Sequence, residues 1–375
     1  MRSPSSAQLF QGMEGTLRFS SNKGTNYRRK KDFVSMEQFR VGVIGCGLIS
    51  AVHIHAINEA DRAVLTAVCD IDPKKKEKTA AEQGVRGYLD YRELLAQPDI
   101  DAVHICVPHY LHAPISIDAL RAGKHVLCEK PMGMSLSEAQ AMVQAAKESD
   151  KTLTVCFQNR YNDASQRMKQ IIDSREMGKV KGGSAFVCWD RGSAYYADSP
   201  WRGKWATEGG SVLINQAIHT LDLMKWLSGG FELKSATMTA KRLAEVIETE
   251  DTCDMLLENE NGGRFLFYCS NCAADNMPVQ LHLLLEKGEL HMTGEQLTII
   301  GPDGASFEDY ATGAKIGKAY WGNSHTHLIA DFYDRLVRGD KPYILPEDGM
   351  STTRLMEEAY LSASTVRRRP QQEKR

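Results

Sequence analysis

The chain has 375 residues, a formal net charge of −2 at pH 7, and 25% charged and 42% hydrophobic residues. This length can hold two domains, and the composition is ordinary for a globular protein. The balanced charge gives no indication of nucleic acid as a partner, and no apolar run reaches the roughly 18 residues that a membrane span requires. The nine cysteines are scattered, which favours free thiols and a cytoplasmic location.

The first 38 residues are polar and show no hydrophobic periodicity. They are rich in Ser, Asn, Gly and basic residues, and they include the run Arg28-Arg29-Lys30-Lys31 but no apolar core of a signal peptide. We therefore predict that residues 1–38 form a disordered, dispensable extension. An alternative is that the natural chain starts at Met36.

From Arg40 to about Phe157, strand-like runs alternate with helix-like segments. Strands are predicted at 40–45, 64–70, 102–107, 125–128 and 152–156, and helices at 49–59, 73–83, 112–122 and 135–149. This alternation indicates βαβ units and a parallel sheet with right-handed crossovers.

A glycine-rich turn, Gly45-Cys46-Gly47-Leu48-Ile49-Ser50, follows the first strand. Gly45 permits a tight turn, and Gly47 lets a phosphate approach the backbone. The next helix would point its free N–H groups at that phosphate. Ser50 replaces the third glycine of the G-x-G-x-x-G pattern, and a residue this small still lets helix and strand pack closely.

Asp70 ends the second predicted strand, about 20 residues after the turn, where an acidic residue binds the adenosine ribose. Turn and acid together predict that residues 39–157 are a Rossmann dinucleotide-binding domain. The carboxylate of Asp70 favours the free hydroxyls of NAD and would repel the 2′-phosphate of NADP. Lys74-Lys75-Lys76 could attract that phosphate, so NADP is the alternative, although these lysines also fit a solvated helix face.

The pattern changes after about residue 158. Helices are expected near 161–177, 211–228, 323–338 and 348–367, and strands at 181–189, 232–241, 249–257, 264–270, 279–286 and 296–300. Consecutive strands with short connections predict a large open, mostly antiparallel sheet. Residues 158–368 should therefore form a second α/β domain, for substrate binding and oligomerisation.

One strand of this second sheet indicates self-association. Leu281, Leu283 and Leu285 alternate with His282 and Leu284, so both of its faces carry apolar side chains. Helices can cover only one of these faces, and the other would leave a large apolar patch. We predict a homodimer or homotetramer that pairs through this sheet.

Ligands of open parallel sheets bind beyond the carboxyl ends of the strands. Three clusters should line that crevice: Val107-Pro108-His109 with His112, Glu129-Lys130-Pro131, and Gln158-Asn159-Arg160-Tyr161. Lys130 would hydrogen-bond a substrate hydroxyl beside the nicotinamide and favour the developing alkoxide. The alternative is a solvated lysine paired with Glu129.

The helix 211–228 is apolar on most sides but carries Asn215, His219 and Asp222 along one stripe. We interpret this stripe, behind Gly209-Gly210, as a wall of the site. His219 would accept the proton of a substrate hydroxyl, because an unperturbed imidazole titrates near neutral pH. The alternative is a core histidine, and no metal is predicted because Asn is a poor ligand for transition metals.

Three motifs carry a resemblance to a known family. They are Gly45-Cys46-Gly47 with Cys69-Asp70-Ile71-Asp72, then Ala122-Gly123-Lys124-His125-Val126-Leu127-Cys128-Glu129-Lys130-Pro131, and finally Gly209-Gly210 followed by Asn215-Gln216-Ala217-Ile218-His219-Thr220-Leu221-Asp222. With these motifs the chain resembles the glucose–fructose oxidoreductase / inositol dehydrogenase / MocA (Gfo/Idh/MocA) family of NAD(P)-dependent oxidoreductases over about residues 39–368.

The resemblance implies roles for individual residues. Lys130 would contact both the nicotinamide ribose and the substrate, and His219 would be the acid/base group. Trp201 and Arg202 would reach the cofactor from the second domain. Many sugar and inositol members carry Asp where this chain has Asn215, which leaves Lys130 and His219 as the predicted catalytic pair.

We assign two sets of binding residues on these grounds. The predicted substrate-binding residues are Arg160, Tyr161, Asn215 and Asp222. The predicted cofactor-binding residues are Gly45, Gly47, Leu48, Ile49, Asp70, Val107, Pro108, His112, Glu129, Lys130, Gln158, Trp201 and Arg202.

The predicted function is an NAD-dependent oxidoreductase that transfers a hydride between NAD and a secondary hydroxyl of a sugar, sugar derivative or glycoside. Lys130 and His219 would handle the proton. The alternatives are an inositol-type dehydrogenase or an NADP-dependent keto-sugar reductase of the same family. A dinucleotide-binding redox sensor is the non-enzymatic alternative, and a sensor would not need the polar stripe of the second domain.

Overall fold

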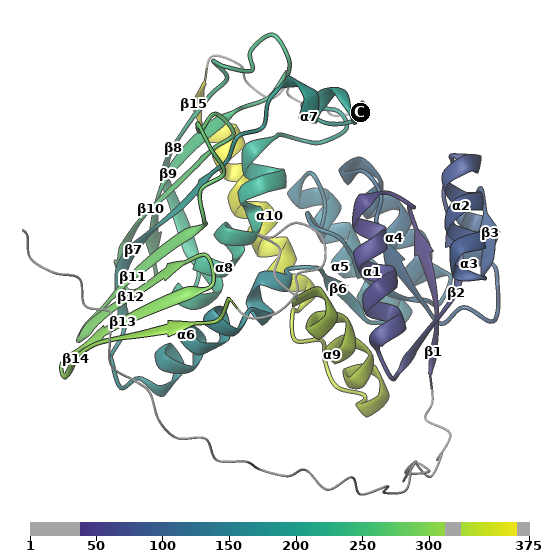
Figure 1. The fold of residues 1–375 in the computed structure, drawn as a ribbon, viewed down its shortest axis with the longest axis horizontal. Coiled ribbons are helices and arrows are strands. Elements are labelled where there is room, and N and C mark those ends of the chain that lie inside the picture. The colour runs from purple at the N-terminus through teal and green to yellow at the C-terminus, as the bar shows by residue number, and fades with distance from the viewer. Residues whose placement is uncertain (1–37, 312–323, 366–375) are drawn as a thin grey trace, which may run out of the picture. The chain divides into compact units, whose positions relative to one another are not determined.

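The computed structural model describes residues 38–311 and 324–365, which lie within one compact unit, Glu37–Arg375 (Figure 1). The predicted extension 1–38 falls outside the described residues except for Gln38, so it stays a prediction. The described part of the chain contains no helix with the length and apolar character needed to cross a bilayer. All nine cysteines lie in the described ranges and are free thiols.

The first sheet has six strands in the order β3-β2-β1-β4-β5-β6. Its strands are β1 (Phe39–Ile44), β2 (Ala63–Cys69), β3 (Arg86–Tyr88), β4 (Ala102–Ile105), β5 (His125–Cys128) and β6 (Leu153–Val155). Every neighbouring pair is parallel, which confirms the predicted Rossmann sheet. The strand order reverses between β1 and β4, the switch point outside which ligands of such sheets bind. The short, largely exposed β3 was missed because three residues show no period.

Five α-helices accompany this sheet in the first part of the chain: α1 (Leu48–Glu59), α2 (Pro73–Gln83), α3 (Tyr91–Leu95), α4 (His112–Arg121) and α5 (Leu136–Ser149). Local signals explain where α2 begins. The Asp72 side chain accepts from the backbone N–H groups of Lys74 and Lys75, and Pro73 occupies the first turn of α2. The whole of α2 has no buried residue; Lys74 and Lys75 are exposed, as a solvated face requires, whereas the side chain of Lys76 is only 18% exposed.

The second sheet has nine strands in the order β14-β13-β12-β11-β7-β10-β9-β8-β15. They are β7 (Val180–Cys188), β8 (Phe231–Thr239), β9 (Thr252–Asn259), β10 (Arg264–Ser270), β11 (Gln280–Leu285), β12 (Gly288–Thr293), β13 (Gln296–Gly301), β14 (Gly304–Asp309) and β15 (Ser364–Thr365). All pairs are antiparallel except β7 with β10 and β8 with β15, so the predicted mostly antiparallel sheet is confirmed. The sequence interpretation missed β12, β14 and β15.

The helices of the second part of the chain are α6 (Asp163–Ser174), α7 (Ser193–Ala197), α8 (Ile218–Ser228), α9 (Ser324–Arg338) and α10 (Pro346–Ser362), together with the single turn η2 (Gln158–Tyr161). Another single turn, η1 (His109–Leu111), precedes α4 in the first part. Helix α8 contacts β7, α10 contacts both β8 and β6 of the first sheet, and α9 packs on α1. The segment predicted as one helix over 211–228 is instead a π-helical stretch, η3 (Val212–Ala217), continued by α8. Wide turns of this kind occur often at functional sites.

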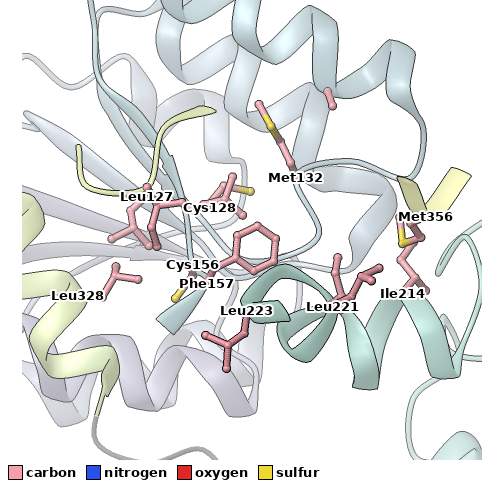
Figure 2. Close-up of a cluster of buried hydrophobic side chains, with 14 of the residues drawn as sticks. Leu127, Cys128, Met132, Cys156, Phe157, Ile214, Leu221, Leu223, Leu328 and Met356 are labelled. Atoms are coloured by element: carbon pink, nitrogen blue, oxygen red, sulfur yellow. The ribbon is translucent and has the colours of Figure 1, made fainter. Parts of the chain in front are cut away.

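One hydrophobic core joins the two sheets. Figure 2 shows Leu127, Cys128, Met132, Cys156 and Phe157, from the strand ends of the first sheet, packed with Ile214, Leu221, Leu223, Leu328 and Met356 from the later helices. Thr154 Oγ1 of β6 also donates to the carbonyl of Ile344, just before α10, at 2.8 Å. This shared packing fixes η3 and α8 opposite the carboxyl ends of the parallel strands.

Candidate active site

The glycine turn has the geometry that a dinucleotide requires. Gly45 adopts a φ of 97°, and a Cβ there would lie 2.3 Å from the carbonyl oxygen of Cys106, so only glycine fits. At Gly47 an added Cβ would meet nothing within 4 Å, and α1 begins there without a side-chain cap. Its first N–H groups therefore remain free of side-chain partners and can receive a phosphate. Leu48, 77% exposed, and the half-buried Ile49 flank this opening.

Asp70 lies at the mouth of the turn. Its Oδ2 accepts from the backbone N–H of Cys46 and its Oδ1 from that of Asp72, both at 2.8 Å. These two bonds fix a half-buried carboxylate that keeps unused lone pairs. The arrangement fits a ribose with free hydroxyls.

We expect NAD to bind more tightly than NADP, because Asp70 would repel a 2′-phosphate. Titration calorimetry with both nucleotides measures the difference, and Asp70→Ala should narrow it. Lys74→Ala tests the alternative that the lysines of α2 attract the 2′-phosphate, and since this lysine is exposed, the affinities for both nucleotides should stay unchanged. Tighter binding of NADP by the unchanged protein would contradict the prediction.

His112 connects the strand ends instead of facing solvent. Its Nδ1 lies 2.7 Å from the carbonyl oxygen of Pro131, and its Nε2 lies 2.9 Å from that of Val107. The side chain is buried, and burial lowers its pKa. The structure therefore gives His112 a positioning role, holding Val107-Pro108 beside the segment that carries Lys130.

Lys130 reaches across to the second part of the chain. Its Nζ donates to the backbone O of Asn215 at 2.8 Å and to Oδ1 of the same residue at 3.0 Å. The alternative of a solvated lysine paired with Glu129 is therefore wrong. Burial lowers the pKa of Lys130, an effect opposed by the carboxylates of Glu129 and Glu208.

Glu129, a predicted cofactor ligand, turns its carboxylate into the core and is 6% exposed. Its Oε1 lies 2.9 Å from Nε2 of His53 and 3.7 Å from Nε2 of His325. Burial alone would raise the pKa of Glu129, but hydrogen bonds from the two histidines bring it well below its ordinary range. This geometry does not support direct contact between Glu129 and the cofactor, because its carboxylate is buried and already contacts His53 and His325.

The same cluster continues away from Glu129. His53 Nδ1 lies 2.9 Å from Nδ1 of His104, whose Nε2 lies 2.8 Å from the hydroxyl of Tyr333. Cys156 comes close enough that His53, Glu129, Cys156 and His325 could in principle hold a metal. His53 and Glu129 already form hydrogen bonds within the cluster. We therefore interpret it as a buried hydrogen-bonded network that supports the segment carrying Lys130.

His219 lies on the first turn of α8 with its ring 6.1 Å from that of Phe157. Burial and the positive charge of Lys130 lower the pKa of His219 to about 3. The expectation of a near-neutral pKa was therefore wrong, and the imidazole is neutral at physiological pH. Its Nδ1 is buried and has no hydrogen-bond partner among the described residues. A neutral imidazole with an unsatisfied nitrogen can accept a hydrogen bond from a substrate hydroxyl, but the lowered pKa makes it a weaker base than a free imidazole.

Arg160 and Asp222 form a buried ion pair. Arg160 Nε and Nη2 donate to Oδ2 and Oδ1 of Asp222, both at 2.7 Å, and Thr352 of α10 donates to Oδ1 at 2.9 Å. Arg160 Nη1 also donates to Oδ2 of Asp348 at 3.2 Å. The side chains of Arg160 and Asp222 are 2% and 1% exposed. This does not support substrate binding by either residue, because packing of α10 on α8 encloses both charges.

The remaining predicted residues lie around the same region. The Tyr161 hydroxyl donates to Asp331 at 2.7 Å, so it is engaged with α9. Gln158 is 3% exposed, and its Oε1 has no partner among the described residues. Trp201 places its ring 4.8 Å from that of His109, and the guanidinium of Arg202 lies 4.2 Å over the ring of Tyr195.

Glu208 belongs to the site and was missed. It is 0% exposed, and its Oε1 accepts from Nδ2 of Asn215 at 2.6 Å while Oε2 accepts from the backbone N–H of Gly203. Burial raises its pKa to about 7. The available signal was an acidic residue directly before Gly209-Gly210, ahead of an apolar helix.

The fold and the site together define a class. A parallel sheet with a phosphate-binding turn and a strand-end acid binds a dinucleotide, and Lys130 meets the polar side of η3 beside it. These are the features of a dinucleotide-dependent oxidoreductase.

The family follows from comparison with known proteins. Residues 39–157 match the oxidoreductase family with NAD-binding Rossmann fold, and residues 165–291 match the GFO/IDH/MocA C-terminal domain. The chain belongs to the Gfo/Idh/MocA family of oxidoreductases, which confirms the resemblance seen in its motifs and NAD as the cofactor.

Relatives cover almost the whole chain. D-apiose dehydrogenase from Rhizobium rhizogenes is 27% identical over 89% of this chain and 98% of its own length. The WlbA dehydrogenase from Bordetella pertussis, solved with NADH and UDP-GlcNAcA, is 29% identical with a TM-score of 0.76 over 87% of this chain and 97% of that one. An oxidoreductase from Agrobacterium radiobacter, solved with NAD+, L-tartaric acid and magnesium, shares the fold at 24% identity, with a TM-score of 0.80 over 87% of this chain and 96% of that one.

Proposed function

We propose that the protein is an NAD-dependent dehydrogenase acting on a secondary hydroxyl of a sugar, sugar derivative or glycoside. The contact of Lys130 Nζ with Asn215, 2.8 Å to O and 3.0 Å to Oδ1, carries this proposal. It sets a cationic donor from the nucleotide-binding sheet beside the helix that bears His219, as proton handling at a hydroxyl requires. A carbohydrate-like substrate is supported by relatives that are a D-apiose dehydrogenase and a dehydrogenase solved with UDP-GlcNAcA.

The chain's own residues would divide the work as follows. When bound at the glycine turn and Asp70, NAD supplies the hydride acceptor. The Lys130 ammonium has three N–H groups, and Asn215 takes two of them, so the third can donate to the substrate oxygen and stabilise negative charge there. The neutral imidazole of His219 is the acceptor for the hydroxyl proton. Trp201 and Arg202 are proposed to border the cofactor.

The direct test is incubation with NAD and a panel of sugars, sugar acids, inositols and glycosides, followed by NADH absorbance. We expect reduction of NAD with at least one sugar or glycoside. Activity confined to inositols would favour the inositol-type alternative, and faster turnover of keto-sugars with NADPH would favour the reductase. Tight NAD binding without turnover of any member of the panel would favour the redox sensor.

We also propose a homodimer or homotetramer that forms through the outer face of the second sheet. The buried side chains of β11 are Leu281, Leu283 and Leu285, and the opposite face carries exposed apolar side chains: Leu266, Leu284, Ile300 and Phe307. Helices α6, α8 and α10 lie on the inner side of this sheet (Figure 1). A patch of this kind is uncommon on a monomer.

Light scattering at micromolar concentration should give a mass of two or four chains. Leu266→Lys with Leu284→Lys should shift the protein towards the monomer, because both charges, on strands that flank β7, would be buried in the interface without partners. The control is Val337→Lys, which places the same charge at an exposed apolar position on α9, outside the second sheet. A monomeric unchanged protein would contradict the proposal.

The nine free thiols support a reducing compartment, the cytoplasm, as the location of the protein.

A further inference from the structure

The carboxylate of Glu208 is linked to Lys130 indirectly, through the side chain of Asn215. Lys130 Nζ donates to Oδ1 of Asn215 at 3.0 Å, and Nδ2 of the same amide donates to Oε1 of Glu208 at 2.6 Å. Glu208 is 0% exposed, and no salt bridge within the described residues neutralises it. A buried carboxylate without an ion-pair partner is costly to keep, so a role for its charge is to be expected.

We propose that Glu208 is a positioning residue that acts on Lys130 through the side-chain amide of Asn215. The inference rests on the proposed function, because it concerns the orientation of the lysine that meets the substrate. Glu208 sets which end of the Asn215 amide faces Lys130, and through that amide it supplies the negative charge that holds the ammonium in place.

The orientation follows from donor and acceptor counts. An ionised carboxylate only accepts hydrogen bonds, so Glu208 must face the NH₂ end of Asn215. The carbonyl end of the amide is then directed at Lys130, whose ammonium only donates. A second fixed contact, from the N–H of Gly203 to Oε2 of Glu208, prevents the carboxylate from turning away.

The same counting predicts what an isosteric substitution would do. In Glu208→Gln, the Gly203 N–H requires the glutamine carbonyl at the Oε2 position, which leaves the glutamine NH₂ facing Asn215. Asn215 must then flip to accept, and its own NH₂ is directed at the Lys130 ammonium. The backbone O of Asn215 still accepts from Lys130 at 2.8 Å, so the lysine is misdirected without being released.

A second substitution should repair this fault. With Asn215→Asp added to Glu208→Gln, the glutamine NH₂ donates to one oxygen of Asp and Lys130 donates to the other. The chain of donors and acceptors is complete again, and the negative charge has moved one residue closer to the lysine. Rescue by this pair is the outcome that a merely structural role for Glu208 does not predict.

Protonation of Glu208 resembles the glutamine substitution. Since Oε2 is occupied by the Gly203 N–H, the proton would sit on Oε1, opposite the NH₂ of Asn215. Burial raises the pKa of Glu208 to about 7, so kcat/KM should fall as pH drops through that region, and Glu208→Gln should lack this acid limb. The charged and titratable groups that face Glu208 are Glu250, Arg202, Lys130, Tyr195 and Tyr196.

The experiment compares the unchanged protein with three variants: Glu208→Gln, the double variant, and Glu250→Gln as a matched buried control. The control is apt because the hydrogen bonds of Glu250 to Ser211, Leu213 and Tyr360 all end on Oε1, which a glutamine carbonyl can replace. Two quantities are measured for each: steady-state kinetics with a substrate from the panel, and the pH midpoint of Lys130 acylation, followed by mass spectrometry.

We expect Glu208→Gln to lower kcat by about tenfold or more, as loss of a hydrogen bond to a charged group does, with NAD affinity unchanged. The midpoint of Lys130 acylation should fall, because one of the carboxylates that raise its pKa is gone. The double variant should regain most of the lost turnover and most of the lost acylation midpoint. Glu250→Gln should keep both at alkaline pH, where Glu208 is ionised, and should only move the acid limb to lower pH, because the charge of Glu250 contributes to the raised pKa of Glu208.

An acylation midpoint unchanged in Glu208→Gln, or a double variant as impaired as Glu208→Gln, would overturn the inference. Acylation needs no substrate, so it decides the role of Glu208 even if no panel member is turned over and the proposed function fails. If Glu208→Gln does not fold, the single variant Asn215→Asp tests the inference in its place. It sets two carboxyl groups within hydrogen-bond distance, where they share a proton, so the acid limb should move to higher pH; an unmoved limb would also overturn the inference.

Discussion

Lys130→Ala is expected to lower turnover by roughly a hundredfold or more, the usual effect of losing a positioned charge stabiliser or proton acceptor. The reason is the placement of Nζ, which Asn215 holds with two hydrogen bonds at 2.8 and 3.0 Å. Steady-state kinetics with an active panel substrate measures the effect. Lys147→Ala is the control, because the side chain of Lys147 is 64% exposed on α5 and its removal should leave turnover unchanged.

His219→Ala should cause a comparable fall, and the double variant should be little worse, because residues that act as a unit are not additive. NAD affinity should survive in His219→Ala, since the predicted action of His219 is on the substrate. His327→Ala, on an exposed position of α9, controls for loss of a histidine. Asn215→Ala should cost less than either, as it only positions Lys130. Near-normal turnover of His219→Ala would mean that the histidine is a core residue.

Asp222→Ala is expected to destabilise the protein by about 3 kcal/mol or more, the usual cost of leaving one partner of a buried ion pair uncompensated. Arg160 would keep only Asp348, at 3.2 Å. Chemical denaturation measures the free energy of unfolding, and unchanged NAD affinity would separate this effect from the cofactor site. Asp340→Ala is the control: it removes a carboxylate from an exposed pair with Arg338 and should leave the midpoint unchanged.

The same pair gives a pH dependence with a defined sign. Burial would raise the pKa of Asp222, but Arg160 holds it below its ordinary value. A carboxyl whose pKa is lower when folded stabilises the protein above its unfolded pKa, about 3.9, and loses that contribution as pH falls through the folded pKa. In Asp222→Ala, the free energy of unfolding should no longer include this decrease at acid pH. An unfolding free energy that depends on acid pH as in the unchanged protein would contradict the assignment.

Local signals in the chain were enough to predict the first sheet. Each of its longer strands is a buried apolar run, and Gly45 and Asp70 stand at the turn and strand end where a dinucleotide needs them. Parallel strands buried on both faces appear in a sequence as nearly continuous apolar runs, so the strands and their parallel direction could be predicted. Their pairing order, β3-β2-β1-β4-β5-β6, does not follow the order along the chain. The short β3 escaped because it is largely exposed and has no period.

Side-chain roles at the site depended on packing that no local pattern contains. Asn215, His219 and Asp222 share one helical stripe, yet their surroundings differ. Asn215 accepts a hydrogen bond from Lys130, burial keeps His219 neutral, and Asp222 forms an ion pair with Arg160 in the core.

The partners of these side chains come from segments far away in sequence. Thr352 reaches Asp222 across 130 positions, and Lys130 reaches Asn215 across 85. Spacing within one helix shows which residues share a face, but it cannot show which distant element covers each part of that face. Only the folded chain decides that, because burial and charge pairing are set by contacts between distant segments, and these in turn set whether a carboxylate binds a substrate or holds the core.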